Sequence, residues 1–229
     1  LCARQNGVWV KYSADDYIEI SHNFSYGLLE LGLKRGDMVI TVSNNRPEWN
    51  FADMGMAMTG VIHVPVFTSL SALEYLYIIK HSEAKLILVS DKKLYKVLNP
   101  AVFASGQPIQ IYSFDEVEGV KNWKEITDAG KANAEKHRQT VDTIKASIQP
   151  DDFASLIYTS GTTGKAKGVM LTHRNMVSNF LAAAKVFKLK PEDKYLSILP
   201  LCHVGGRLGN YQTQFSGTSI YYAENMGTI

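Results

Sequence analysis

Residues 158–168 read Tyr-Thr-Ser-Gly-Thr-Thr-Gly-Lys-Ala-Lys-Gly, the most informative stretch of the chain. It follows one strand-like run, residues 153–157, and precedes another, residues 169–172. Three glycines, four Ser or Thr hydroxyls and two lysines within eleven residues leave almost no side chain that could build a core. A segment of this composition between two apolar strands is typical of a loop that wraps an anion.

Each residue type in this loop suits phosphate. Glycine lets backbone N–H groups approach an anion closely, hydroxyls donate hydrogen bonds, and lysines supply charge. The residues that we predict to bind a phosphate group are Thr159, Ser160, Gly161, Thr162, Thr163, Gly164, Lys165, Lys167 and Gly168. The alternative is a flexible surface loop, which also favours Gly, Ser and Thr. Two lysines spaced by small residues at the end of an apolar strand argue against that alternative.

The spacing excludes two common phosphate-binding loops. A Walker A loop needs glycine where this chain has Thr159, and Ser or Thr where it has Ala166. The dinucleotide-binding GxGxxG spacing fails as well, because the glycines here are three and four residues apart. The loop therefore belongs to another kind of nucleotide site.

The rest of the chain alternates short β-branched runs with amphipathic helical patterns, which indicates an α/β fold with mixed, largely parallel sheets covered by helices. We predict strands over residues 8–12, 38–43, 61–66, 84–90 and 109–113. Helices are expected after Ser13, which offers an N-cap, from Pro47, and over residues 71–81. Thr172 is expected to cap a further helix that begins at His173.

The pattern loosens between residues 99 and 150, where prolines and glycines interrupt it and residues 122–146 are polar. We interpret residues 122–146 as a solvated helical connector rather than a binding patch. The chain then divides into a first α/β portion (1–98), a connector (99–150) and a phosphate-loop portion (151–229).

Charge and cysteine usage exclude several classes of protein. The 24 basic and 22 acidic residues give a net charge of +2, so we expect no nucleic-acid partner. Cys2 and Cys202 form neither a disulfide framework nor a zinc pattern, which favours a reducing compartment and a cytoplasmic location. The longest apolar stretch, 52–67, has too many breaks for a transmembrane helix, and the first residues lack the apolar core of a signal peptide.

Residues 158–168 closely resemble the phosphate-binding signature of the adenylate-forming superfamily, which includes acyl-CoA synthetases, luciferases and the adenylation domains of peptide synthetases. The usual pattern has proline just before the second lysine, where this chain has Ala166. The resemblance implies that the loop holds the β- and γ-phosphates of ATP while a substrate carboxylate attacks the α-phosphorus. It also implies that Thr159 faces Mg²⁺ and that Lys167 is catalytic.

A second segment, Leu199-Pro-Leu-Cys-His203, is similar to the LPLxH element of these enzymes, in which the histidine or a nearby aromatic residue borders the acyl pocket. Residues 45–49, 64–65 and 219–224 resemble the long-chain fatty-acid–CoA ligase branch. Two departures concern the acyl pocket: Val-Gly-Gly-Arg at 204–207 replaces an aromatic and a glutamate before the arginine, and Phe67-Thr68 replaces aromatic-Pro-Thr. We interpret Gly205 and Gly206 as packing residues at a helix start rather than as a widened pocket.

The resemblance implies that residues 1–229 are part of the large N-terminal adenylation domain of a long-chain fatty-acid–CoA ligase, without the C-terminal domain. The full-length enzyme would form acyl-AMP from ATP and a fatty acid, and then the thioester with coenzyme A. The alternatives are an aryl or short-chain acid–CoA ligase, and a non-catalytic nucleotide- or acyl-binding module. Lys167 and His203 are the candidate catalytic residues. Peripheral membrane contact and a homodimer remain open, and a thiol mechanism through Cys202 and His203 is disfavoured because adjacent residues rarely face each other.

Overall fold

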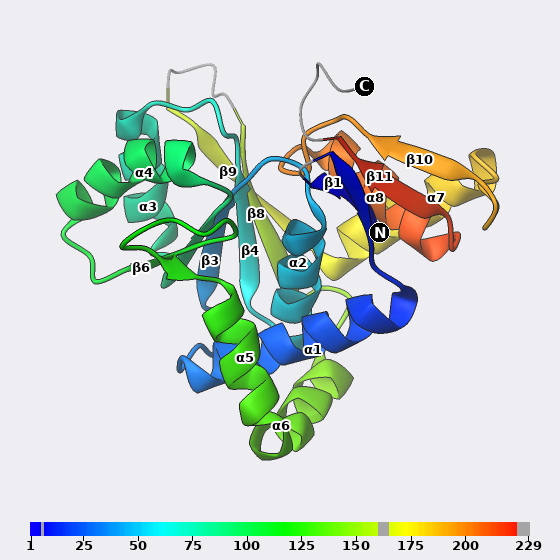
Figure 1. The fold of residues 1–229 in the computed structure, drawn as a ribbon, viewed down its shortest axis with the longest axis horizontal. Helices are drawn as coiled ribbons and strands as arrows, with labels where there is room; N and C mark the ends of the chain where they lie inside the picture. The colour runs from blue at the N-terminus through cyan, green and yellow to red at the C-terminus, as the bar shows by residue number, and fades with distance from the viewer. Residues whose placement is uncertain (6, 160–164, 224–229) are drawn as a thin grey trace.

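The structure is a computed structural model, and it describes residues 1–5, 7–159 and 165–223. Within those ranges the chain forms two sheets and eight helices (Figure 1). The larger sheet has the order β7-β6-β5-β3-β4-β8-β9 and is parallel except for β9, which runs antiparallel to β8. Its strands are β3 (Met38–Val42), β4 (Ile62–Val66), β5 (Leu86–Val89), β6 (Gln110–Ser113), β7 (Lys121–Asn122), β8 (Phe153–Thr159) and β9 (Lys167–Thr172). The mixed, largely parallel α/β fold predicted from the sequence is therefore confirmed.

Helices cover both faces of this sheet because its central strands are apolar on both sides. One face packs on α3 (Ala72–Ser82) and α4 (Lys92–Ser105) through Ile40, Val42, Ile87 and Val89. The opposite face packs on α1 (Ala14–Glu30) and α2 (Pro47–Thr59) through Val39, Leu86 and Leu88. Pro100 lies inside α4, so treating it as a break in the sequence was wrong.

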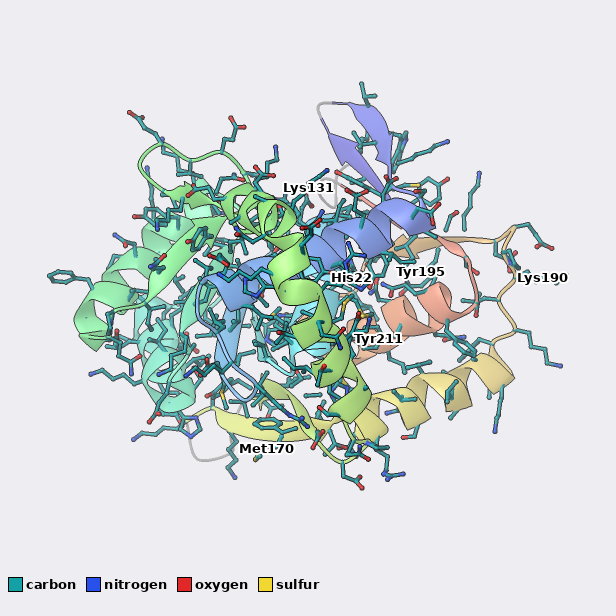
Figure 2. The ribbon with its side chains drawn as sticks, turned by 90° about the horizontal axis from the view of Figure 1, so that it is seen from below. His22, Lys131, Met170, Lys190, Tyr195 and Tyr211 are labelled. Atoms are coloured by element: carbon teal, nitrogen blue, oxygen red, sulfur yellow. The ribbon has the colours of Figure 1, made fainter. Side chains whose placement is uncertain are left out.

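Residues 122–146 are less solvated than the sequence suggested, because they form two helices of which one packs tightly on α1. These are α5 (Lys124–Ala132) and α6 (Ala134–Ser147). A Cβ atom on Gly130 would lie 1.8 Å from the Asn23 carbonyl oxygen, so only glycine permits this helix crossing. Lys131 of α5 lies beside α1 (Figure 2), and its ammonium nitrogen is 3.2 Å from the Glu19 carboxylate.

The smaller sheet, also counted over the described ranges, has the order β10-β11-β1-β2. Its strands are β1 (Cys2–Gln5), β2 (Val8–Lys11), β10 (Lys194–Ser197) and β11 (Ser219–Tyr222), and β1 pairs in parallel with β11. Two further helices, α7 (His173–Val186) and α8 (Val204–Phe215), lie on the same side of the molecule (Figure 1). Trp49 of α2 packs with Leu201, Ile220 and Tyr222, which joins the smaller sheet to the rest of the fold. None of the helices in the described part is long and apolar enough to cross a membrane.

Candidate functional site

The predicted phosphate loop connects the two strands of a β-hairpin. β8 and β9 are antiparallel, and Thr159 pairs with Lys167 while Tyr158 pairs with Gly168. Thr159 and Lys167 are exposed where the paired part of the hairpin ends. The hairpin thus places one hydroxyl and one ammonium group side by side at the base of the loop. Of the predicted phosphate ligands, Ser160, Gly161, Thr162, Thr163 and Gly164 lie outside the described residues.

A cavity of about 760 Å³ opens beside this hairpin. Thr159 and Lys165 line it from the hairpin, and His203 lines it from the start of α8. The lining includes Lys165 but not Lys167, which lies on β9 next to the cavity. The remaining walls come from apolar side chains on α3, β4 and β8, among them Leu73, Ile78, Val66 and Ile157. The phosphate-loop segment and the Leu199–His203 segment were predicted separately and are 35 to 45 residues apart in sequence. They meet at this one cavity.

Asn45 holds the Leu199–His203 segment in place. Its side-chain amide donates to the Leu199 carbonyl at 2.7 Å, and its Oδ1 accepts from the Leu201 N–H at 3.0 Å. His203 then caps α8, because its Nδ1 accepts a hydrogen bond from the Gly205 N–H at 3.1 Å. The ring therefore has a fixed orientation at the cavity, with its centroid 6.4 Å from that of Phe67.

Of the two glycines after this cap, Gly206 serves close packing, whereas a Cβ atom on Gly205 would meet only the His203 ring, at 3.3 Å. A Cβ atom on Gly206 would lie 2.3 Å from the Pro200 carbonyl oxygen. The predicted cap of the preceding helix is also confirmed, since Thr172 and Asn175 form a capping box at the start of α7.

A buried ionic network joins α2, β8 and α8, and the sequence did not predict it. Arg207 of α8 donates through Nη2 to Asp53 Oδ1 at 2.5 Å, through Nη1 to Ser155 Oγ at 2.6 Å and through Nε to the Tyr211 hydroxyl at 2.8 Å. Tyr211, labelled on α8 in Figure 2, in turn donates to Asp53 Oδ2 at 2.5 Å. Each of the three guanidinium nitrogens therefore donates a hydrogen bond, as a buried charge requires.

His63 of β4 completes this network on the side of the larger sheet. Its Nδ1 lies 2.7 Å from Asp53 Oδ1 and its Nε2 lies 2.9 Å from Thr41 Oγ1. Burial lowers the pKa of His63 despite the opposing effect of Asp53, so the ring is neutral at pH 7. Burial alone would raise the pKa of Asp53, but Arg207 and His63 outweigh it and hold that pKa at about 2.

This network fixes the relative position of β8, which ends at Thr159, and α8, which His203 caps. Ser155 lies four residues before Thr159 on β8, and Arg207 lies four residues after His203. Asp53 and Arg207 are 154 residues apart in sequence, and no local spacing links them. The signal in the sequence was weak. It consisted of Asp53, which stands among apolar residues in the second half of α2, and of Arg207 among small residues at the start of α8.

Cys202 does not have the properties of a nucleophile. Its side chain is buried, and burial raises the pKa of the thiol to about 12, so the reactive thiolate is disfavoured at neutral pH. This agrees with the low weight that the sequence gave to a thiol mechanism.

The donor set at the hairpin suits phosphate better than a metal ion alone. Among the described residues there is no group of three or more His, Cys, Asp or Glu side chains that could hold a metal. Glu74 lines the cavity, but its carboxylate accepts hydrogen bonds from the Ser71 N–H and hydroxyl at 2.8 and 2.7 Å. The described residues at the hairpin end thus offer the Thr159 hydroxyl and the lysine ammonium groups, which are donors suited to phosphate oxygens.

Comparison with known proteins identifies the family of the chain. The profile of the AMP-binding enzyme family matches residues 3–228. The chain belongs to this family. It is 32% identical to fatty acyl-CoA synthetase A of Dictyostelium discoideum over 216 residues, covering 82% of this chain and 31% of that protein. It is also 32% identical to the long-chain-fatty-acid–CoA ligase ACSBG2 of Xenopus laevis over 234 residues, covering 98% of this chain and 31% of that protein.

A solved structure extends the likeness to the fold of this AMP-binding enzyme chain. ATP-bound MatB from Rhodopseudomonas palustris superposes with a TM-score of 0.77 at 22% identity, over 96% of this chain and 41% of that one. The chain spans about a third of the length of the two curated relatives. The resemblance to the adenylate-forming superfamily stated from residues 158–168 is thus confirmed.

Proposed function

We propose that residues 1–229 are part of the N-terminal adenylation domain of an AMP-forming long-chain fatty-acid–CoA ligase. The observation that carries the proposal is the meeting of the Thr159–Lys167 hairpin end with Lys165 and His203 around one cavity. The names of the two curated relatives support a fatty acid as the acid substrate. ATP, a fatty acid and coenzyme A would be the substrates, and the cytoplasm is the location that we propose.

The residues of the hairpin would act by electrostatics rather than by covalent chemistry. Attack of a carboxylate on the α-phosphorus builds negative charge on the phosphate oxygens and releases pyrophosphate, and fixed N–H groups and ammonium groups stabilise such charge. Lys167 and Lys165 would supply the positive charge, and Mg²⁺, held partly by Thr159, would neutralise phosphate charge when bound. His203, held by its cap, would orient the acid at the cavity.

The choice of acid is tested with a chain-length series on the full-length protein. AMP release is measured in a coupled assay with palmitate, octanoate, acetate and benzoate at matched concentrations. We expect the highest kcat/KM with palmitate. A preference for acetate or benzoate would replace our proposal with the short-chain or aryl alternative, and no turnover with any acid would favour a non-catalytic binding module.

The role of Lys167 is tested by Lys167→Ala in the same full-length protein. Removing a charge that acts on phosphate should lower fatty-acid-dependent ATP–pyrophosphate exchange by roughly 10²–10³-fold. Lys167 has no ion pair or buried contact among the described residues, so the free energy of unfolding should change by less than about 0.5 kcal/mol. Exchange at the unaltered rate would remove Lys167 from the site.

A further inference from the structure

Helix α3 contacts both ends of the phosphate hairpin. At the exit, the Tyr77 hydroxyl donates a hydrogen bond to the Ala166 carbonyl oxygen at 3.1 Å. At the entry, His81 Nδ1 and the Tyr158 hydroxyl are hydrogen-bonded at 2.7 Å. Neither α3 residue belongs to a recognised motif, and they lie 89 and 77 residues before their partners. α3 thus holds Ala166, the last residue before β9, and Tyr158, the residue before Thr159.

The three side chains also pack as one aromatic cluster. The Tyr77 and His81 rings are stacked with centroids 5.5 Å apart, and the His81 and Tyr158 rings meet edge to face at 5.6 Å. Burial raises the pKa of Tyr158 to about 12, so its hydroxyl stays protonated and available for the hydrogen bond at neutral pH. The contact between α3 and the hairpin therefore combines hydrogen bonds with the packing of aromatic rings.

α3 is rigid enough to serve as an anchor. A capping box of Ser71 and Glu74 fixes its start, and its opposite face is buried through Tyr75, Ile78 and Ile79. Tyr77 and His81 are four residues apart and so lie one above the other on the face turned to the hairpin. Both side chains consequently project from a fixed backbone.

We propose that Tyr77 and His81 are positioning residues of the phosphate loop, and that the Tyr77 hydrogen bond restrains Ala166 where the superfamily pattern has proline. Proline fixes its own φ angle, whereas alanine leaves it free. The carbonyl of Ala166 shares a planar peptide unit with the N–H of Lys167. A hydrogen bond that orients this carbonyl therefore orients the start of β9 and with it Lys167. The inference rests on the proposed function only for the identity of the nucleotide.

The experiment compares Tyr77→Phe with the unaltered full-length protein. The change removes one oxygen and keeps the ring stacked on His81. We expect the KM for ATP in palmitate-dependent pyrophosphate exchange to rise about fivefold, in line with the loss of one hydrogen bond, with the KM for palmitate unchanged. Amide hydrogen exchange over residues 165–172 should become faster. Tyr112→Phe is the matched control, because its hydroxyl donates to the Gln110 side chain at 3.0 Å on β6, away from the hairpin.

A rescue variant tests the restraint itself. Tyr77→Phe combined with Ala166→Pro should recover at least half of the lost ATP affinity, and no recovery would overturn the restraint. An unchanged KM for ATP together with unchanged amide exchange in Tyr77→Phe would overturn the positioning role. A rise in the KM for palmitate alone would also overturn it, because Tyr77 lines the cavity and would then act on the acid. Amide exchange needs no turnover, so this outcome is separate from a failure of the proposed function.

Discussion

Arg207 and Asp53 are opposite charges that are almost fully buried, with about 5% of each side chain exposed. Removing Arg207 leaves the Asp53 carboxylate buried without an opposite charge, although His63 and Tyr211 still hydrogen-bond to it, and breaking such a buried pair costs about 3–5 kcal/mol. We expect Arg207→Met to lower the free energy of unfolding by that amount in urea titrations. Arg35→Met is the control: the Arg35–Asp152 pair is at the surface and should contribute at most about 1 kcal/mol. Equal losses in the two variants would contradict the importance of burial.

His63, which belongs to the same buried network, makes the free energy of unfolding depend on pH. Its pKa is lowered in the folded protein, so below about pH 6.5 the unfolded chain binds a proton that the native ring resists. The free energy of unfolding should therefore fall as the pH drops from 7 to 5. His63→Gln should reduce the slope of the free energy of unfolding against pH by up to the equivalent of one bound proton. His173, whose pKa burial also lowers, keeps part of the slope in the variant. A slope unchanged by His63→Gln would contradict a neutral His63.

At the scale of elements, the join between the Leu199–His203 segment and α8 depends on Gly206. A side chain there would meet the carbonyl oxygens of Pro200 at 2.3 Å and Leu199 at 2.7 Å, and both belong to backbone held by Asn45. We expect Gly206→Ala to destabilise the protein by about 1–3 kcal/mol in urea unfolding and to displace His203. Gly205→Ala is the matched control, because its Cβ atom would lie 3.3 Å from His203 Nδ1 and should be tolerated better. Greater damage from Gly205→Ala would refute this account.

Local patterns in the sequence predicted the elements well because local physics forms them. Ser13 caps α1, the strand expected over residues 8–12 appears as β2 of the smaller sheet, and the other expected strands appear in the larger sheet. Residues 158–168 join two strands. Contacts between distant segments were not predictable in this way. The polar network of Asp53 and Arg207 and the contact of Tyr77 with Ala166 arise only when α2, α3, β8 and α8 are packed together. Sequence patterns therefore identified the segments that carry the candidate site residues, but not the contacts with α3 and the Asp53–Arg207 network that hold these segments in place.

At the scale of the whole molecule, we propose that the described residues contribute one side of a nucleotide site. They bring the end of the hairpin, His203 and the cavity walls together, but among them no cluster of acidic side chains could hold Mg²⁺. The matched part makes up 31% of the length of each curated relative, so we propose that further residues are needed to close the site around ATP.

The last prediction follows from this division. Residues 1–229 expressed alone should show no palmitate-dependent ATP–pyrophosphate exchange, whereas the full-length protein should show it, because adenylation needs the charge on the phosphates to be stabilised from every side. Both proteins are assayed at equal molar concentration, with far-UV circular dichroism as the check that the shorter chain is folded. Exchange catalysed by the folded shorter chain would mean that the Thr159–Lys167 hairpin, Lys165 and His203 suffice for the chemistry.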